Sequence, residues 1–364
     1  MQIPLWKKLW AICIAAALGV LAGAAPAFAQ PGDLARSLAA ELGVSGDLGE
    51  PTHGAGFAEC CRCRVRPQDE VWVISSRHLG WPSCDCETPA LKYWRWDCGA
   101  NKWKKLSADA FFETDSAPVV TFVYVHGNRV NSWLAVDLGW YTYNAVVRQG
   151  DEDRPVRYVM YSWPSTEVQG QLKDLRYKAA RTDAEAFYLG WVVSHIREDV
   201  PVSLMGFSFG SRVITGAMHC AAGGRICGPQ LAEGKPHRRN VRTVLMAPAL
   251  HNYWLSPGCY HGKAMDICEK NVILANSCDP ILRHYHWLVR GERPTALGSF
   301  GVAWRHPSGR IAEYDCAPCV GKTHDSLMYL NAASTLHKAR QCVLWSDAPP
   351  SSAGANPNRQ TRSS

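Results

Sequence analysis

The chain has 364 residues, of which 47% are hydrophobic and 20% are charged. This balance is typical of a globular protein and excludes a disordered or fibrous chain. The length is enough for one large α/β domain with additions, or for two modest domains. The formal net charge is +7, but no run of Lys and Arg is interleaved with aromatic residues, so we expect no nucleic-acid partner.

Residues 1–29 have the pattern of a secretory signal. Lys7 and Lys8 supply positive charge, residues 9–25 are apolar, and Ala27-Phe28-Ala29 has the small-x-small pattern of a cleavage site. We expect the segment to be removed, no stable membrane span to remain, and the protein to be exported to the periplasm, the cell surface or the medium. An uncleaved anchor is the alternative, because the apolar run nearly reaches the roughly 20 residues of a membrane span.

The chain has 15 cysteines, and all except Cys13 follow the signal. An even number in an exported protein predicts disulfides, although the sequence leaves their connectivity open. A zinc site is the alternative for the C-x-C pairs, but zinc sites more often use C-x₂-C, so we expect no metal. Two even groups fall in the N-terminal part (Cys60, Cys61, Cys63, Cys84, Cys86, Cys98) and in the rest (Cys220, Cys227, Cys259, Cys268, Cys278, Cys316, Cys319, Cys342).

Apolar runs alternate with helical segments along most of the chain, which predicts an α/β fold with a doubly wound, mostly parallel sheet. We divide the chain into a lead-in and cysteine-rich segment (30–116) with a disulfide-rich strand pair, a main domain (117–345) and a disordered tail (346–364). Thr182 and Glu185 have the spacing of a capping box at the start of a helix. The predicted strands are 70–75, 91–96, 119–125, 156–161, 202–205, 241–246 and 271–275, and the predicted helices are 132–147, 182–197, 211–221 and 327–330.

Gly206-Phe207-Ser208-Phe209-Gly210 follows a short apolar run and fits G-x-S-x-G, the nucleophile elbow. A serine on such a sharp strand-to-helix turn is exposed above the edge of the sheet. Its neighbours two positions away tolerate little beyond glycine, because strand and helix pass close together. Ser208 is therefore the predicted nucleophile.

Two further side chains of a catalytic triad are expected at the carboxyl ends of later strands. Asp279 follows the strand 271–275, and His324 lies on a polar loop before the last predicted helix. The order Ser208, Asp279, His324 agrees with the order in α/β-hydrolases and with neither protease order. Other residues compete for the acid role (Asp266, Asp315, Asp325) and for the base role (His284, His286, His306).

The strand 119–125 ends in His126-Gly127-Asn128. A His-Gly pair followed by asparagine at this strand end suits an oxyanion hole. We expect the backbone N–H of Asn128 and that of Phe209 to be the two donors, and His126 to have a structural role.

Residues from about 118 to 324 resemble an α/β-hydrolase family of unknown function, DUF900. The resemblance rests on Tyr124-Val125-His126-Gly127-Asn128, on Tyr161-Ser162-Trp163-Pro164-Ser165 and on the elbow. It implies the α/β-hydrolase fold and a Ser208 nucleophile, and says little about substrate. The family elbow commonly reads H-S-M-G-N, whereas Phe207, Phe209 and Ser211 stand here.

These observations predict an exported serine hydrolase that cleaves a carboxylic ester or a related acyl bond without a cofactor. We expect a small-molecule or lipid-like acyl substrate and a small lid formed by residues 247–270, closed by a Cys259–Cys268 bridge. Trp163, Tyr253, Trp254 and Tyr260 either line its pocket or pack in the core. The alternative is a non-catalytic, disulfide-stapled surface protein that binds glycans or protein partners through an aromatic-rich face.

Overall fold

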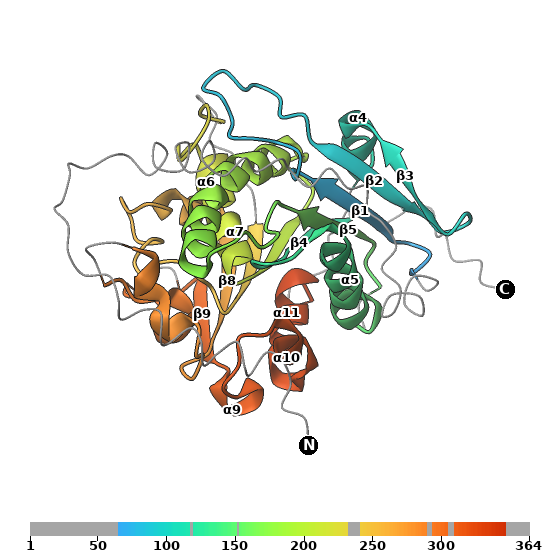
Figure 1. Cartoon of the computed structure of the whole chain (residues 1–364). Helices are drawn as coiled ribbons and strands as arrows, with labels where there is room; N and C mark the ends of the chain where they lie inside the picture. Colours follow the sequence, from blue (N-terminus) through green and yellow to red (C-terminus); the bar gives the residue numbers. More distant parts are fainter. Residues whose placement is uncertain are drawn as a thin grey trace.

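The computed structural model describes residues 65–116, 119–150, 153–231, 241–289, 293–304 and 309–346. Within them lies a nine-stranded sheet in the order β3-β2-β1-β5-β4-β6-β7-β8-β9 (Figure 1). β2 is antiparallel to both of its neighbours, and every other neighbouring pair is parallel. The strands are β1 (Glu70–Ser75), β2 (Lys92–Asp97), β3 (Lys102–Leu106), β4 (Val120–Val125), β5 (Val156–Ser162), β6 (Val202–Phe207), β7 (Val241–Met246), β8 (Cys268–Ala275) and β9 (Ile311–Asp315).

Helices cover both faces of the sheet, as the doubly wound prediction requires. α6 and α7 pack together on one face, and α5, α10 and α11 lie on the other (Figure 1). The helices are α4 (Ala108–Phe112), α5 (Ser132–Thr142), α6 (Gln171–His195), α7 (Phe209–Ala221), α8 (Leu297–Phe300), α9 (Ala317–Val320), α10 (Ser326–Asn331) and α11 (Ala333–Val343), with a π-helical turn at Tyr143–Arg148 and 3₁₀ turns at Gly262–Asp266 and Leu282–Leu288.

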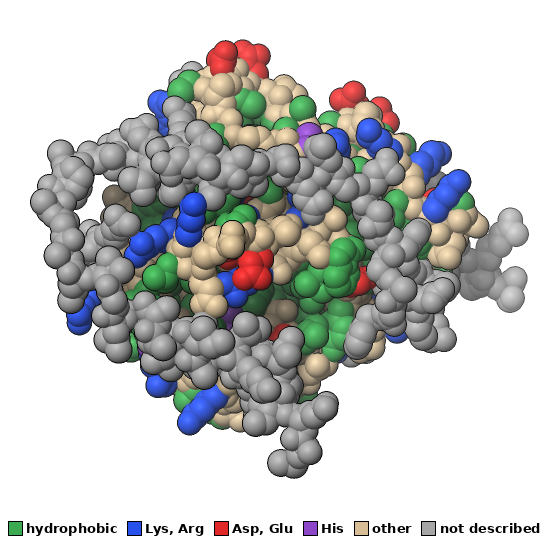
Figure 2. Space-filling model, in the orientation of Figure 1, with side chains coloured by type: hydrophobic (Ala, Val, Ile, Leu, Met, Phe, Trp, Pro, Cys, Tyr) green, Lys and Arg blue, Asp and Glu red, His purple; other side chains and the backbone are tan. Residues whose placement is uncertain are grey.

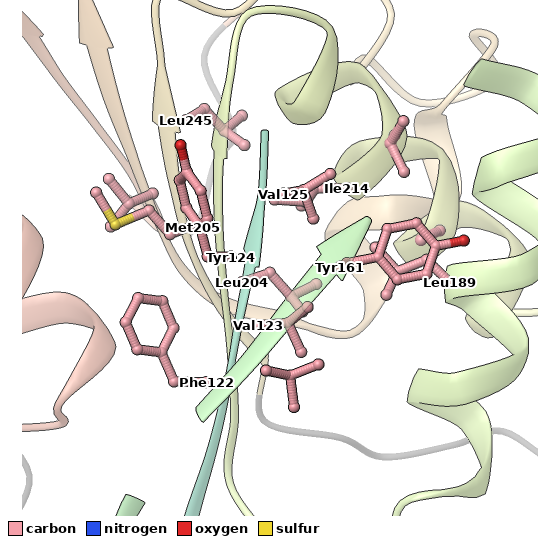
Figure 3. Close-up of a cluster of buried hydrophobic side chains, with 14 of the residues drawn as sticks. Phe122, Val123, Tyr124, Val125, Tyr161, Leu189, Leu204, Met205, Ile214 and Leu245 are labelled. Atoms are coloured by element: carbon pink, nitrogen blue, oxygen red, sulfur yellow. The ribbon is translucent and has the colours of Figure 1, made fainter. Parts of the chain in front are cut away.

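The central strands are buried on both sides. Every residue of β4 is buried, and alternate side chains point to opposite faces, as a strand requires. Val123 and Val125 lie toward α6 and α7, whereas Phe122 and Tyr124 lie on the opposite side (Figure 3). The core therefore has two layers separated by the sheet. This arrangement fits the α/β-hydrolase fold.

Strands with a buried apolar run were predicted closely, and edge strands were missed. The predicted bounds of β1 and β7 match the structure, and the other predicted strands differ by a few residues. β3 and β9 were not predicted, because these edge strands carry mostly polar residues and few of their positions are buried. α11 was also missed.

α6 corrects the predicted capping box. The helix spans 25 residues, so Thr182 and Glu185 lie inside it rather than at its start. Glu185 is fully buried and accepts hydrogen bonds from Ser76 at 2.5 Å and Tyr161 at 2.9 Å, and it pairs with Arg181 at 2.7 Å. Thr182 and Glu185 have the spacing of a capping box, but Glu185 takes part in buried hydrogen bonds inside the helix. The predicted start of α6 was therefore wrong.

The cysteines also differ from expectation. No disulfide joins any two cysteines of the described ranges, and Cys268 lies buried at the start of β8 without a bond to Cys259. The predicted lid bridge is therefore wrong in this structure. The predicted signal (1–29) and the predicted disordered tail beyond Ser346 lie outside the described residues, as do Cys60, Cys61 and Cys63.

The described ranges contain no group of three or more His, Cys, Asp or Glu side chains placed to hold a metal ion. No helix in them combines the length and the hydrophobicity needed to cross a membrane.

Candidate active site

Ser208 occupies a strained turn between β6 and α7. Its backbone has φ 54° and ψ −117°, a conformation that costs a residue with a side chain of order 1–3 kcal/mol. A Cβ atom on Gly206 would lie 2.7 Å from the backbone carbon of Gly210, and one on Gly210 would lie 2.2 Å from the carbonyl oxygen of Val125. Both glycines are therefore needed for the close passage of strand and helix, as the motif predicts.

The structure brings Ser208, His324 and Asp279 into one hydrogen-bonded chain. His324 Nε2 lies 2.9 Å from Ser208 Oγ, and His324 Nδ1 lies 2.6 Å from Asp279 Oδ2. The residues follow β6, β9 and β8, whose carboxyl ends share one edge of the sheet. Because the carboxylate accepts the hydrogen of Nδ1, Nε2 is left to accept the hydroxyl hydrogen of Ser208.

Asp279 is held rigidly for this contact. Its side chain is buried, and its second oxygen, Oδ1, accepts hydrogen bonds from the backbone N–H of Ile281 at 2.8 Å and of Leu282 at 2.9 Å. One carboxylate oxygen therefore fixes the turn and leaves the other for His324.

The competing residues make other contacts. Asp315 accepts from Ser277 and Ala317, and Asp325 caps α10 by accepting from the N–H of Leu327. Asp266 ends a 3₁₀ turn, His284 stacks on Trp287, and the ring of His286 lies 6.0 Å from that of Trp287. His306 lies outside the described residues. None of the described competitors forms a side-chain hydrogen bond with Ser208 or His324.

The sequence did not reveal two residues that hold His324. The Phe207 ring packs against the imidazole, with 4.8 Å between centroids. Asn276 Nδ2 donates to the carbonyl oxygens of Gly321 at 2.9 Å and Thr323 at 3.1 Å, which fixes the loop that carries His324. An asparagine one residue past β8 gave no signal, because its partners lie 45 and 47 positions further along the chain.

The two predicted oxyanion donors are available. In the described part of the chain, neither the Asn128 nor the Phe209 backbone N–H donates a hydrogen bond to the protein. Phe209 is the first residue of α7, where the amides have no partner inside the helix and the helix dipole favours negative charge. The Asn128 side chain is turned away to Asp174, with Nδ2 3.2 Å from Oδ2.

His126 lies below this loop as a buried, neutral imidazole. Burial and the charge of Arg77 lower its pKa to about 3. Its Nδ1 lies 2.9 Å from the carbonyl oxygen of Gly127, and its own carbonyl accepts a hydrogen bond from the indole of Trp163 at 2.9 Å. These contacts make it a scaffold for the loop.

The four aromatic residues named for a pocket have different surroundings. Trp163 is buried against His126, and Trp254 is buried under the Arg212 guanidinium, 4.5 Å from the ring centroid. Tyr260 donates a hydrogen bond to Asp183, whereas Tyr253 is 40% exposed. Packing and hydrogen bonding inside the protein therefore account for Trp163, Trp254 and Tyr260.

No family model matches the chain, and no curated protein matches it in sequence. The resemblance to DUF900 therefore stays a prediction from short motifs.

Among solved structures, the chain is similar to lipase B from Aspergillus fumigatus, with a TM-score of 0.36, 11% identity, and alignment over 66% of this chain and 56% of the lipase. It is also similar to an esterase from Pyrobaculum calidifontis (TM-score 0.29, 12% identity, 69% and 78% covered). The catalytic core domain of acetyl xylan esterase from Trichoderma reesei gives a TM-score of 0.29 and 12% identity, over 62% of this chain and 100% of that one. The chain spans just over half the length of the lipase.

Proposed function

We propose that the protein is a serine hydrolase that cleaves a carboxylic ester or a related acyl bond. The observation that carries this proposal is the chain of two hydrogen bonds from Ser208 through His324 to the buried Asp279. A strained serine at a helix N-terminus, next to two available backbone N–H groups, supplies the remaining parts of acyl-transfer chemistry.

In the proposed mechanism, His324 Nε2 accepts the hydroxyl proton as Ser208 Oγ attacks the substrate carbonyl. Asp279 stabilises the imidazolium, and the N–H groups of Asn128 and Phe209 donate to the oxyanion. His324 then gives the proton to the departing alkoxide, which leaves an acyl-serine. A water molecule attacks the acyl carbon and loses a proton to His324, and that proton returns to Ser208 as the acid leaves.

The distribution of exposed apolar side chains favours an apolar acyl or aryl group in the substrate. Hydrophobic side chains gather over α5, the helix whose first turn carries the exposed Trp133 (Figure 2). In the described ranges, seven large exposed hydrophobic residues lie on segments that follow parallel strands of the sheet: Trp133, Leu172, Tyr253, Ile281, Trp287, Phe300 and Met328. A small or lipid-like acyl ester suits this surface. We also propose that the enzyme is exported, a proposal supported by the secretory pattern of residues 1–29.

Hydrolysis of p-nitrophenyl esters of increasing acyl length tests the proposal on the protein expressed from the full chain. We expect turnover that disappears in Ser208→Ala and persists in Ser277→Ala, a matched change beside Asp279 at a hydroxyl that bonds to Asp315. Turnover that survives Ser208→Ala would contradict the proposal. No turnover by folded protein with any ester would instead favour the non-catalytic interpretation, a surface protein that binds glycans or protein partners.

A further inference from the structure

A fully buried carboxylate lies directly behind the loop that offers the Asn128 N–H. Asp174, in the first turn of α6, has 0% of its surface exposed. Its Oδ2 lies 3.2 Å from Asn128 Nδ2 and 3.3 Å from Arg129 Nε, and its Oδ1 accepts the backbone N–H of Val168 at 3.0 Å. Two of its three donors therefore belong to consecutive residues of one loop.

The same loop contains a strained residue. Arg129 has φ 58°, in the left-handed region that residues other than glycine rarely adopt. Its guanidinium is held from two sides, by Asp174 and by Glu167 at 3.4 Å. The Asn128 N–H lies in the peptide plane between Gly127 and Asn128. Because Asp174 binds the side chains of both Asn128 and Arg129, it restrains the backbone next to this plane and so limits where the Asn128 N–H points.

The segment Ser162-Trp163-Pro164-Ser165 holds the other side of the loop. Ser165 Oγ accepts the N–H of Val130 at 3.2 Å and donates to its carbonyl at 2.9 Å. Arg77 also donates to that carbonyl, at 2.9 Å, and the Trp163 indole donates to the carbonyl of His126. The Ser-Trp-Pro-Ser segment, which contributes no residue to the triad, thus holds both ends of residues 126–130. Asp174 holds the middle of the same loop.

We propose that Asp174 is a positioning residue for the oxyanion donor: through Asn128 and Arg129 it aims the Asn128 N–H at the carbonyl oxygen of the substrate. This inference rests on the proposed function, because it assigns a task within the same reaction. Asp174 touches no reacting atom. Its effect is on the geometry of the transition state, so its loss lowers kcat and leaves KM nearly unchanged.

Asp174→Asn tests the assignment with little change of shape. The amide replaces one of the two acceptor oxygens by a donor, so the contacts to Asn128, Arg129 and Val168 can no longer all form. We expect kcat for the best ester to fall by roughly 10- to 100-fold, the range for a misplaced or lost oxyanion donor, with KM within about twofold of the wild type. Asp115→Asn is the matched control, because it removes a buried carboxylate that pairs with Arg157. We expect Asp115→Asn to reduce stability and leave kcat unchanged.

A pair of variants at Arg129 separates positioning from general stability. Arg129→Lys and Arg129→Met have side chains of similar length and impose the same backbone strain, but only lysine keeps a cation beside Asp174 and Glu167. The Arg129 side chain is 40% exposed, so both proteins should fold. We expect kcat near the wild-type value for lysine and several-fold lower for methionine. Equal kcat values in the two variants would overturn the assignment.

Hydrogen exchange gives a readout that does not need turnover. In Asp174→Asn, amides of residues 126–131 should exchange faster than in the wild type, while those of α7 stay unchanged. Unchanged exchange in residues 126–131, or wild-type kcat in Asp174→Asn, would overturn the assignment even if Ser208 proves essential. A wild-type protein without esterase activity would instead remove the proposed function, and the exchange experiment would still decide whether Asp174 orders the loop.

Discussion

The serine side of the site and its Asp–His side are held by different forces. Around Ser208 the conformation is fixed by close backbone packing, in which a Cβ atom on Gly206 would meet Gly210 and one on Gly210 would meet Val125. On the other side the groups are held by side-chain hydrogen bonds. Asp279 binds two nearby backbone N–H groups with one oxygen, and its bond to His324 and the bonds of Asn276 to the His324 loop join segments 45 or more positions apart. The elbow therefore tolerates almost no substitution, whereas the position of Asp279 and His324 depends on single hydrogen bonds.

The largest expected effect on catalysis, after loss of Ser208 itself, is at Asp279. In Asp279→Asn the side-chain NH₂ group faces His324 Nδ1, so the imidazole hydrogen moves to Nε2. Nε2 can then no longer accept the proton of Ser208. By analogy with serine proteases, kcat should fall roughly 10⁴-fold. Steady-state ester hydrolysis measures it, and a loss below about tenfold would separate Asp279 from the base.

Gly210→Ala should break the elbow as a structure. The new Cβ would meet the carbonyl oxygen of Val125 at 2.2 Å, a backbone atom that cannot rotate away. We expect a loss of about 3 kcal/mol in the free energy of unfolding, measured by urea denaturation, together with lost activity. Gly80→Ala is the control, because nothing lies within 4 Å of a Cβ at that position. Equal stability of the two variants would contradict the steric account.

Asn276→Ala should have a smaller effect, confined to the Asp–His side. It removes both hydrogen bonds to the loop that carries His324, so the imidazole samples positions away from Ser208. We expect kcat to fall about tenfold, with the fold retained by circular dichroism. Wild-type kcat in Asn276→Ala would show that Phe207 and Asp279 suffice to hold His324.

The last expected effect appears only below neutral pH, as a change in the pH dependence of stability at His126. Its pKa falls to about 3 in the folded protein, so it stays neutral there, whereas the unfolded chain binds a proton below about pH 6.5. The neutral His126 therefore contributes fully to the free energy of unfolding above about pH 6.5, and this contribution is lost as the pH falls toward 3. The unfolding free energy should therefore drop by about 1.4 kcal/mol per pH unit more than in His126→Gln. Identical slopes in the wild type and in His126→Gln would contradict the neutral, buried state of His126.

The parts of the molecule that sequence could predict are those set by local patterns. The buried runs of β1 and β7 were located closely, and Ser208, Asp279 and His324 were named from a motif, from strand ends and from chain order. The structure places these three side chains together, while their catalytic roles remain the proposal made above.

The parts that sequence could not predict depend on distant partners. Glu185 resembles a capping residue in sequence, but in the structure it accepts a hydrogen bond from Ser76, which lies 109 positions away. Asp174 lies 45 and 46 positions from the loop residues that it binds, and Asn276 gave no signal for the same reason. Buried polar networks of this kind have no periodicity, so only the fold reveals them.

The most direct test of the central claim is labelling with a fluorophosphonate, followed by mass-spectrometric mapping of the modified residue. The account predicts a single adduct on Ser208 that is absent in Ser208→Ala and strongly slowed in His324→Ala, because only a serine activated by its base reacts quickly. No adduct on folded protein, or an adduct on another serine while Ser208 stays unmodified, would contradict it.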